Sequence, residues 1–349
     1  MQTHNIFESW SKILRGHTPI LSIEVTRECP LSCPGCYAYG SDHLGGGVTL
    51  RELTDKRGDD LVRGVLELAD RHKPLHITLV GGEPMVRHRE LSRIIPELCA
   101  RGIYTMIVTS GIIPIPAEWM EIPLFTAAIS VDGLPEHHNI RRAPATYDRL
   151  LGNIAGRRVN IHWTITAPML ERDSYLEEYV AFWNAREEVR HIWVSIYSPQ
   201  RGEESAERLS PAQRERVARE LPLLSAKFRK LLTPEGYAKA LLHPPASPAQ
   251  CTFSRLSKNY SADLRTRVEP CVFGGDPDCS QCGCSASAAA HWVSEIQVAG
   301  PLRAKHLLHG SMRIGSAIAR LQHVANPAWR ERDAAPQTEH EPLVQISMD

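Results

Sequence analysis

Short apolar runs alternate with longer helical stretches between residues 20 and 197, and this alternation predicts an α/β fold with a parallel sheet. The apolar runs are near-continuous, as is typical of parallel strands covered on both faces. Six successive strand–helix units with right-handed crossovers form either a partial barrel or a doubly wound sheet. In both arrangements the loops after the strands share one edge of the sheet, where such folds place their sites.

The predicted strands are rich in Ile, Val and Leu, whereas the predicted helices are longer and more polar. Strands are expected at residues 20–25, 75–80, 103–109, 124–131, 159–166 and 191–197. Helices are expected between them at residues 50–72, 88–101, 116–120, 147–156 and 174–186.

The composition is that of an ordinary globular protein. The 349 residues are 42% hydrophobic and 23% charged, which excludes wholesale disorder. Lys plus Arg and Asp plus Glu both number 40, so bulk positive charge does not favour a nucleic-acid partner. No apolar run approaches the roughly 18 residues of a membrane span. Residues 1–16 lack the apolar core of a signal peptide, so a cytoplasmic location is expected.

Composition also divides the chain beyond the strand–helix units, with a Pro-rich break near residues 243–248. The segment after this break holds five of the nine cysteines among many Gly, Asp and Ser, and the last segment contains a candidate amphipathic helix at 304–321. The expected divisions are a barrel over 1–200, a helical linker over 201–245, a loop-rich cysteine region over 246–300, and a C-terminal helix and tail over 301–349.

Three cysteines, Cys29, Cys33 and Cys36, follow the first predicted strand with the spacing C-x3-C-x2-C. Cysteines in a chain without an export signal more often bind metal or do chemistry than form disulfides. Three thiolates can hold a [4Fe–4S] cluster and leave its fourth iron open to an added ligand. The alternative is a structural zinc site, which would need a fourth protein ligand close by.

The second predicted strand ends in Gly81, Gly82, Glu83 and Pro84. Together with the cysteine spacing, this sequence resembles the cysteine loop and GGEP motif of the radical S-adenosylmethionine (SAM) enzymes. The resemblance implies that the two glycines allow close approach of a ligand and that Glu83 receives the SAM ammonium group. Alone, the four residues would equally suit a simple strand-to-helix turn.

Loops after the next two strands extend the resemblance. Ser110 lies in an element similar to T-N-G, and Ser130 and Asp132 lie in one similar to S-x-D-G. The resemblance implies that Ser130 lies near the SAM carboxylate or ribose. It places Arg141, in a segment similar to H-D-x-x-R, against the SAM carboxylate, although the adjacent Arg142 could be the true partner. The alternative is that these are ordinary polar groups of solvated loops.

The family resemblance implies a partial (β/α)6 TIM-like barrel and an enzyme that binds SAM at a [4Fe–4S] cluster. One electron, from a low-potential donor of flavodoxin or ferredoxin type, cleaves SAM to methionine and a 5′-deoxyadenosyl radical that attacks the substrate. One departure concerns the residue before the third cysteine. Many family members carry an aromatic residue there, whereas this chain has Gly35, so the adenine must bind elsewhere, and Tyr37 is a candidate.

The second cysteine group has the spacing C-x19-C-x7-C-x2-C and resembles the Twitch-type auxiliary region, a smaller relative of the SPASM domain. The resemblance implies one auxiliary [4Fe–4S] cluster held by Cys251, Cys271, Cys279 and Cys282. Cys284 is a spare or alternative ligand. The alternative is a zinc ribbon with the same Cys-x2-Cys knuckle.

The substrate is expected to be a small molecule or a lipid. The C-terminal cysteine layout is similar to that of radical SAM synthases that attach adenosyl to hopene, and the first twenty residues are too few for a winged-helix peptide-recognition domain. The amphipathic segment at 304–321 would then supply peripheral membrane contact. Two alternatives are a maturase of a ribosomally synthesised peptide and a non-catalytic iron–sulfur or zinc protein.

Overall fold

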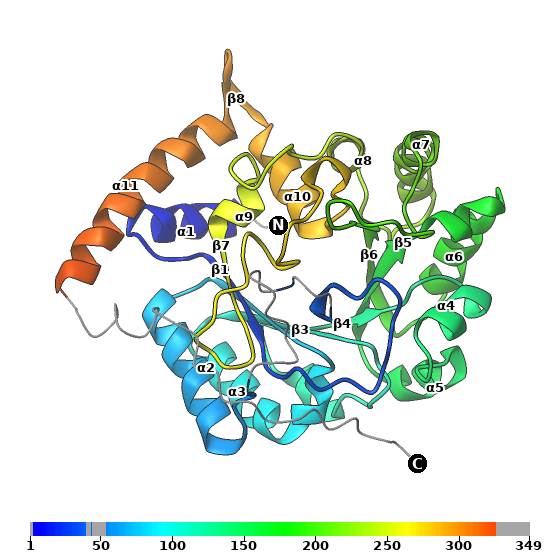
Figure 1. Ribbon diagram of the computed structural model, residues 1–349, viewed down its shortest axis with the longest axis horizontal. Helices are drawn as coiled ribbons and strands as arrows, with labels where there is room; N and C mark the ends of the chain where they lie inside the picture. Colours follow the sequence, from blue (N-terminus) through cyan, green and yellow to red (C-terminus); the bar gives the residue numbers. More distant parts are fainter. Residues whose placement is uncertain (1–2, 40–42, 44–53, 326–349) are drawn as a thin grey trace.

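The computed structural model describes residues 3–39, 43 and 54–325. Its centre is a seven-stranded sheet in which every neighbouring pair is parallel (Figure 1). The strands are β1 (Ile20–Glu24), β2 (His76–Val80), β3 (Tyr104–Thr109), β4 (Phe125–Ser130), β5 (Val159–Ile165), β6 (Val189–Ile196) and β7 (Ser257–Tyr260). The α/β prediction is confirmed, and all six predicted strands form at the expected places.

The strand order is β6-β5-β4-β3-β2-β1-β7. From β1 to β6 each strand pairs with the next one along the chain, and the order never reverses. Doubly wound sheets reverse their strand order at a switch point, so this order favours a barrel. The sheet is not closed, as expected of a partial barrel. The seventh strand was not predicted, and it comes from the C-terminal cysteine region.

One face of the sheet packs against helices, and the other faces the barrel interior. Strands β2 and β3, and β5 from Ile161 onward, alternate between buried and half-buried residues. Trp163 of β5, for example, is fully buried and stacks on Tyr179 with 3.9 Å between ring centroids. Burying a large aromatic side chain contributes about 1.5–3 kcal/mol, so such contacts anchor the helices to the sheet.

The helices of the barrel lie outside the strands (Figure 1). They are α2 (Gly58–His72), α3 (His88–Ala100), α4 (Pro135–Arg141), α5 (Tyr147–Ile154) and α6 (Tyr175–Asn184). The helix predicted at 50–72 begins only at Gly58, and its first four residues lie outside the described residues. The segment predicted at 116–120 is a 3-10 helix, Ala117–Glu121. The short α4 was not predicted.

The C-terminal half adds helices near the two edge strands of the sheet, β6 and β7. They are α7 (Pro211–Lys227), α8 (Glu235–Leu242), α9 (Thr252–Leu256) and α10 (Ser285–Ser294). Helix α7 begins at a capping box, in which Ser210 Oγ accepts from the Gln213 amide and Gln213 Oε1 accepts from the Ser210 amide. Strand β7 pairs with β1, so the cysteine region shares the barrel sheet. The predicted domain divisions stay a prediction.

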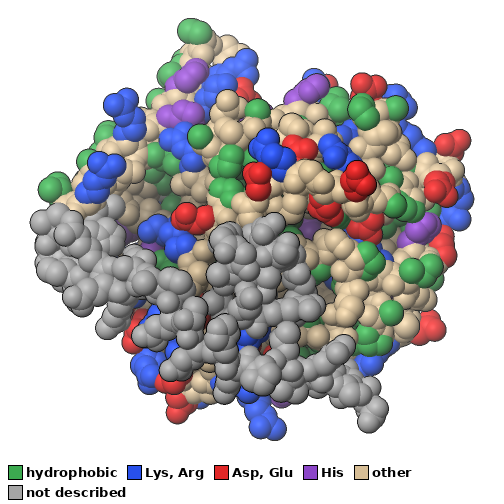
Figure 2. Space-filling model, in the orientation of Figure 1, with side chains coloured by type: hydrophobic (Ala, Val, Ile, Leu, Met, Phe, Trp, Pro, Cys, Tyr) green, Lys and Arg blue, Asp and Glu red, His purple; other side chains and the backbone are tan. Residues whose placement is uncertain are grey.

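The predicted C-terminal helix forms as α11 (Ala304–Ala325), after a small hairpin of β8 (Gln297–Ala299) and β9 (Leu302–Arg303). It lies along α1 (Thr3–Leu14), as Figure 1 shows at the upper left. Gly315 permits this packing, because a Cβ there would lie 1.9 Å from the Ile13 carbonyl oxygen. Within the described part of the chain, no helix is long and apolar enough to cross a membrane. Figure 2 shows acidic and basic side chains interspersed over the face of the molecule seen in Figure 1.

Candidate functional site

The loop after β1 carries Cys29, Cys33 and Cys36, and a buried carboxylate holds its first residues. Asp55 Oδ2 accepts hydrogen bonds from Thr26 Oγ1 at 2.6 Å and from the Arg27 amide at 3.0 Å. All three thiols are free. Burial raises the pKa of Cys29 to about 12 and also raises the pKa of Cys36. A metal cluster bound here must therefore displace thiol protons.

The loop after β2 packs directly on the cysteine loop. The Gly82 amide donates to the Thr26 carbonyl at 2.8 Å, and the Glu83 amide donates to the Glu28 carbonyl at 2.7 Å. A Cβ at Gly81 would lie 2.3 Å from the Thr26 oxygen, and a Cβ at Gly82 would lie 2.3 Å from the Glu28 oxygen. Two glycines are therefore required for the backbones of these two loops to meet.

The Glu83 side chain joins the loops after β2 and β3. Its Oε1 accepts from the Met85 amide at 3.0 Å and from Thr109 Oγ1 at 2.5 Å. Its Oε2 accepts from the amide of Ser110 at 2.8 Å and from the hydroxyl of Ser110 at 2.6 Å. A carboxylate has about four acceptor positions, and these hydrogen bonds from protein donors occupy the acceptor positions of Glu83. Receipt of the SAM ammonium group by Glu83 stays a prediction.

Asp132, directly after β4, is fully buried between two arginines. Its Oδ2 accepts from Arg141 Nε at 2.9 Å and from Arg142 Nε at 2.7 Å, and its Oδ1 accepts from the Thr164 amide at 3.2 Å. Burial alone would raise the pKa of Asp132, but the charges of Arg142 and Arg141 hold it well below its usual range. Asp132 is therefore an ionised group held by protein partners, with its side chain almost fully buried, and its contact with SAM stays a prediction.

The two arginines differ in whether their guanidinium donors are already bound by protein groups. Arg141 also forms an ion pair with Glu207, through Nη1. The terminal amines of Arg142 have no hydrogen-bond partner among the described residues. Burial lowers the pKa of Arg142, and the charges of Asp132 and then Cys33 overcome this effect and raise it above its usual range. Arg142 is thus the arginine whose terminal amines have no partner among the described residues, and its charge acts on the cysteine loop, as that of Arg141 also does.

The space beside Gly35 is filled by a side chain that follows β6, the edge strand opposite to β7. Gly35 has φ +61°, and a Cβ there would lie 2.5 Å from the hydroxyl oxygen of Tyr197, which follows β6. The sequence did not single out Tyr197. Tyr37 instead packs its ring against His43 and Phe273, with centroids 5.6 and 5.3 Å away. Adenine binding by Tyr37 stays a prediction.

A buried ion pair connects β1 to the C-terminal cysteine region. His43 Nε2 lies 2.7 Å from Glu24 Oε1, and His43 Nδ1 lies 3.0 Å from the Phe273 carbonyl oxygen. Ser261 Oγ donates to Glu24 Oε2 at 2.9 Å. Burial lowers the pKa of His43, but the hydrogen bond to Glu24, the charge of Glu24 and the Phe273 carbonyl together outweigh burial and raise it. Both ring nitrogens face acceptors, so the imidazolium form fits this position.

The five C-terminal cysteines all line one cavity, whose walls include Pro245, Pro248, Phe253 and Phe273. The cysteines are Cys251, Cys271, Cys279, Cys282 and Cys284. Burial raises the pKa of Cys271 to about 12 and that of Cys279 to about 11. In the described residues, no three His, Cys, Asp or Glu side chains converge on a point that would hold one metal ion. Five thiols around a cavity fit the four-ligand requirement of an iron–sulfur cluster.

Comparison with known proteins defines the class of the barrel. Residues 23–182, which include the cysteine loop at the edge of the sheet, match the model of the Radical SAM superfamily. This class of enzyme domain uses a [4Fe–4S] cluster and SAM, as the sequence predicted. The cluster ligands, SAM contacts and auxiliary cluster stay predictions.

Two curated relatives are named PqqA peptide cyclase. The chain is 36% identical over 96 residues to the protein from Xanthomonas campestris pv. campestris strain B100, covering 27% of this chain and 23% of that protein. It is 36% identical over 92 residues to the protein from Methylocella silvestris, covering 26% and 22%. The chain thus spans less than a quarter of the length of these cyclases.

Two solved structures share the fold. Streptococcus suis SuiB bound to precursor peptide SuiA has a TM-score of 0.54 and 16% identity, covering 77% of this chain and 64% of that one. Native anSMEcpe with bound AdoMet, which is SAM, has a TM-score of 0.54 and 14% identity, covering 88% of this chain and 99% of that one. These likenesses confirm the predicted fold class.

Proposed function

We propose that this chain is a radical SAM enzyme that modifies a peptide. The observation that carries the proposal is the three-cysteine loop after β1, held by Gly81 and Gly82 within a radical SAM domain. When bound, the cluster and SAM supply a 5′-deoxyadenosyl radical that removes hydrogen from a substrate. The partial barrel orients the substrate at the edge of the sheet and excludes water.

Different residues of the chain bind the cluster and SAM in this proposal. Cys29, Cys33 and Cys36 hold the cluster as thiolates. Arg142 binds the SAM carboxylate, because its terminal amines have no partner in the part of the chain that the structure describes and its charge acts on the cysteine loop. Arg141 is a positioning residue, because Asp132 and Glu207 already bind its guanidinium. A low-potential electron donor of flavodoxin or ferredoxin type supplies the electron.

Two observations favour a peptide over the small-molecule or lipid substrate expected from the sequence. The relatives are named peptide cyclases, and two structures of the fold contain a peptide. In addition, α11, the segment expected to contact a membrane, packs against α1, and Trp10 Nε1 donates to Ser311 Oγ at 2.5 Å. A helix used in this way is a surface helix docked on the barrel.

The substrate class is tested with peptides encoded by short reading frames beside the gene. We expect one of them to increase 5′-deoxyadenosine formation by reduced enzyme and to change mass during the reaction. The matched control is the Arg142→Gln variant, which should bind less SAM and modify less peptide. Binding of the protein to neutral or anionic vesicles, with every peptide left unmodified, would contradict the peptide assignment.

We also propose that the five-cysteine cavity holds one auxiliary [4Fe–4S] cluster, with Cys251, Cys271, Cys279 and Cys282 as ligands and Cys284 as the spare. The cavity supports the proposal, since it brings together cysteines up to 33 positions apart in the chain. The phenyl and proline groups in its walls would limit solvent access to a cluster, and solvent access is one determinant of cluster potential.

Iron counting tests the auxiliary cluster. Anaerobically purified wild-type protein should hold about eight irons, and the variant with Ala at the four proposed ligands should hold about four, because each cluster contains four. Cys99→Ala, which removes a buried thiol on α3, is the control and should retain about eight. Zinc in place of the second four irons would identify the cavity as a zinc ribbon instead.

A further inference from the structure

Arg214 of α7 is a buried cation in the wall of the auxiliary cysteine region. Its side chain leaves the helix and donates three hydrogen bonds to backbone carbonyls. The acceptors are Leu241 at 2.5 Å, Gln281 at 2.9 Å and Cys282 at 2.9 Å. The last two belong to the Cys-x2-Cys knuckle, so this one side chain fixes the backbone that carries Cys282 and leads to Cys284.

The charge of Arg214 has no carboxylate partner at ion-pair distance in the described part of the chain. Carbonyl groups satisfy its N–H donors, but they do not neutralise a buried charge. Burial lowers the pKa of Arg214, and the charges of Cys282 and Asp278 partly oppose this effect. A buried guanidinium with only carbonyl partners requires a compensating negative charge nearby.

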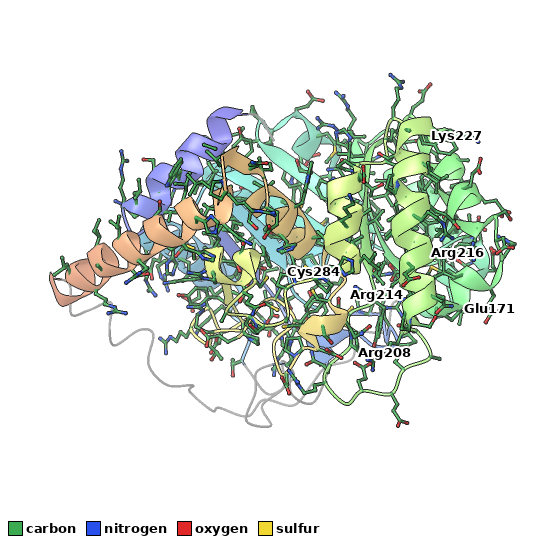
Figure 3. All side chains as sticks on the ribbon, turned by 90° about the horizontal axis from the view of Figure 1, so that it is seen from above. Glu171, Arg208, Arg214, Arg216, Lys227 and Cys284 are labelled. Carbon is green, nitrogen blue, oxygen red and sulfur yellow. The ribbon has the colours of Figure 1, made fainter. Side chains whose placement is uncertain are left out.

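The neighbouring Arg216 shows how differently an arginine of the same helix is used. Arg216 forms ion pairs with Asp173 at 3.2 Å and with Glu220 at 2.9 Å. Figure 3 shows Arg214 on the side of α7 that faces Cys284, and Arg216 on the opposite side. The two residues are separated by only two positions, and they differ in burial, in partners and in distance from the cysteines.

Four cysteine thiolates outweigh the positive charge of a [4Fe–4S] core, so a fully ligated cluster is an anion, and its reduced form is a stronger one. We propose that Arg214 is a positioning residue that fixes the cysteine knuckle and raises the reduction potential of a cluster in the five-cysteine cavity. This inference rests on the auxiliary cluster proposed above. A fixed cation stabilises the more negative reduced form, since the Coulomb energy grows with the charge of the cluster.

The test is a reductive titration followed by electron paramagnetic resonance. Full-length protein with Ala at Cys29, Cys33 and Cys36 is used as the parent, so that only the auxiliary cluster gives a signal. In this parent, Arg214→Gln should retain about four irons and shift the midpoint potential to a more negative value. Arg214→Lys, which keeps the charge, should shift the potential much less. The matched control is Arg216→Gln, which removes the same charge from the far side of α7 and should leave the potential unchanged.

The outcomes separate this inference from the cluster proposal. A parent without iron would overturn the auxiliary cluster itself. An iron-loaded Arg214→Gln variant with the potential of the parent would overturn the role of Arg214, and so would equal shifts in the Gln and Lys variants. If the Gln variant loses its iron, the Lys variant decides: a potential close to that of the parent supports the role, and a large shift or loss of iron overturns it.

Discussion

Replacing Cys29, Cys33 and Cys36 together with Ala is expected to abolish reductive SAM cleavage and to remove about four of about eight irons. The reason is that the loop after β1 would lose all the thiolates that hold a cluster with an open iron. The proposed cluster of the five-cysteine cavity cannot substitute, because a fully ligated cluster leaves no iron open to SAM. The measurement is 5′-deoxyadenosine formation by the reduced protein, together with iron content.

Two comparisons make this result specific to the loop. Cys99→Ala, another buried thiol, should leave both the iron content and the SAM cleavage unchanged. The variant with Ala at the four proposed auxiliary ligands should lose iron but keep uncoupled SAM cleavage. Undiminished 5′-deoxyadenosine formation in the triple variant would show that these cysteines do not hold the catalytic cluster.

Asp132→Ala is expected to lower the free energy of unfolding by about 3–5 kcal/mol, because it removes a buried carboxylate and leaves the Arg142 guanidinium without its counter-charge. Arg142 depends on Asp132 as its ion-pair partner, whereas Arg141 keeps Glu207. The control is Asp173→Ala, which removes a fully exposed carboxylate and should change stability by less than about 1 kcal/mol. Denaturant unfolding monitored by circular dichroism measures both.

The effect should be constant across neutral pH. The pKa of Asp132 is depressed in the folded protein. Its contribution to stability is therefore complete above the unfolded pKa of about 3.9 and is lost only as the pH falls toward the folded pKa. The difference between wild type and Asp132→Ala should thus be the same at every pH from about 5 to 8. A difference below about 1 kcal/mol, or one that varies across this range, would contradict the role of Asp132.

The sequence alone predicted features that depend on local pattern. The six barrel strands are apolar runs, and a run of this kind indicates a buried strand from local sequence alone. The cysteine loop and the Gly81-Gly82-Glu83-Pro84 segment each lie within a few residues of a strand end, so their arrival at one edge follows from parallel strand order. The strand β7 was missed because its sequence, Ser-Lys-Asn-Tyr, carries no apolar run.

Tertiary structure decided the contacts between residues far apart in the chain. Only the folded barrel brings Tyr197 against Gly35, and only the packing of α7 carries Arg214 to the cysteine knuckle. The sequence placed Arg141 against SAM with Arg142 as the alternative, and only the folded structure shows that Arg141 also pairs with Glu207. The physical reason is common to these cases. Local spacing determines strands, turns and ligand motifs, whereas a buried charge or ring finds its partner only when distant segments pack together.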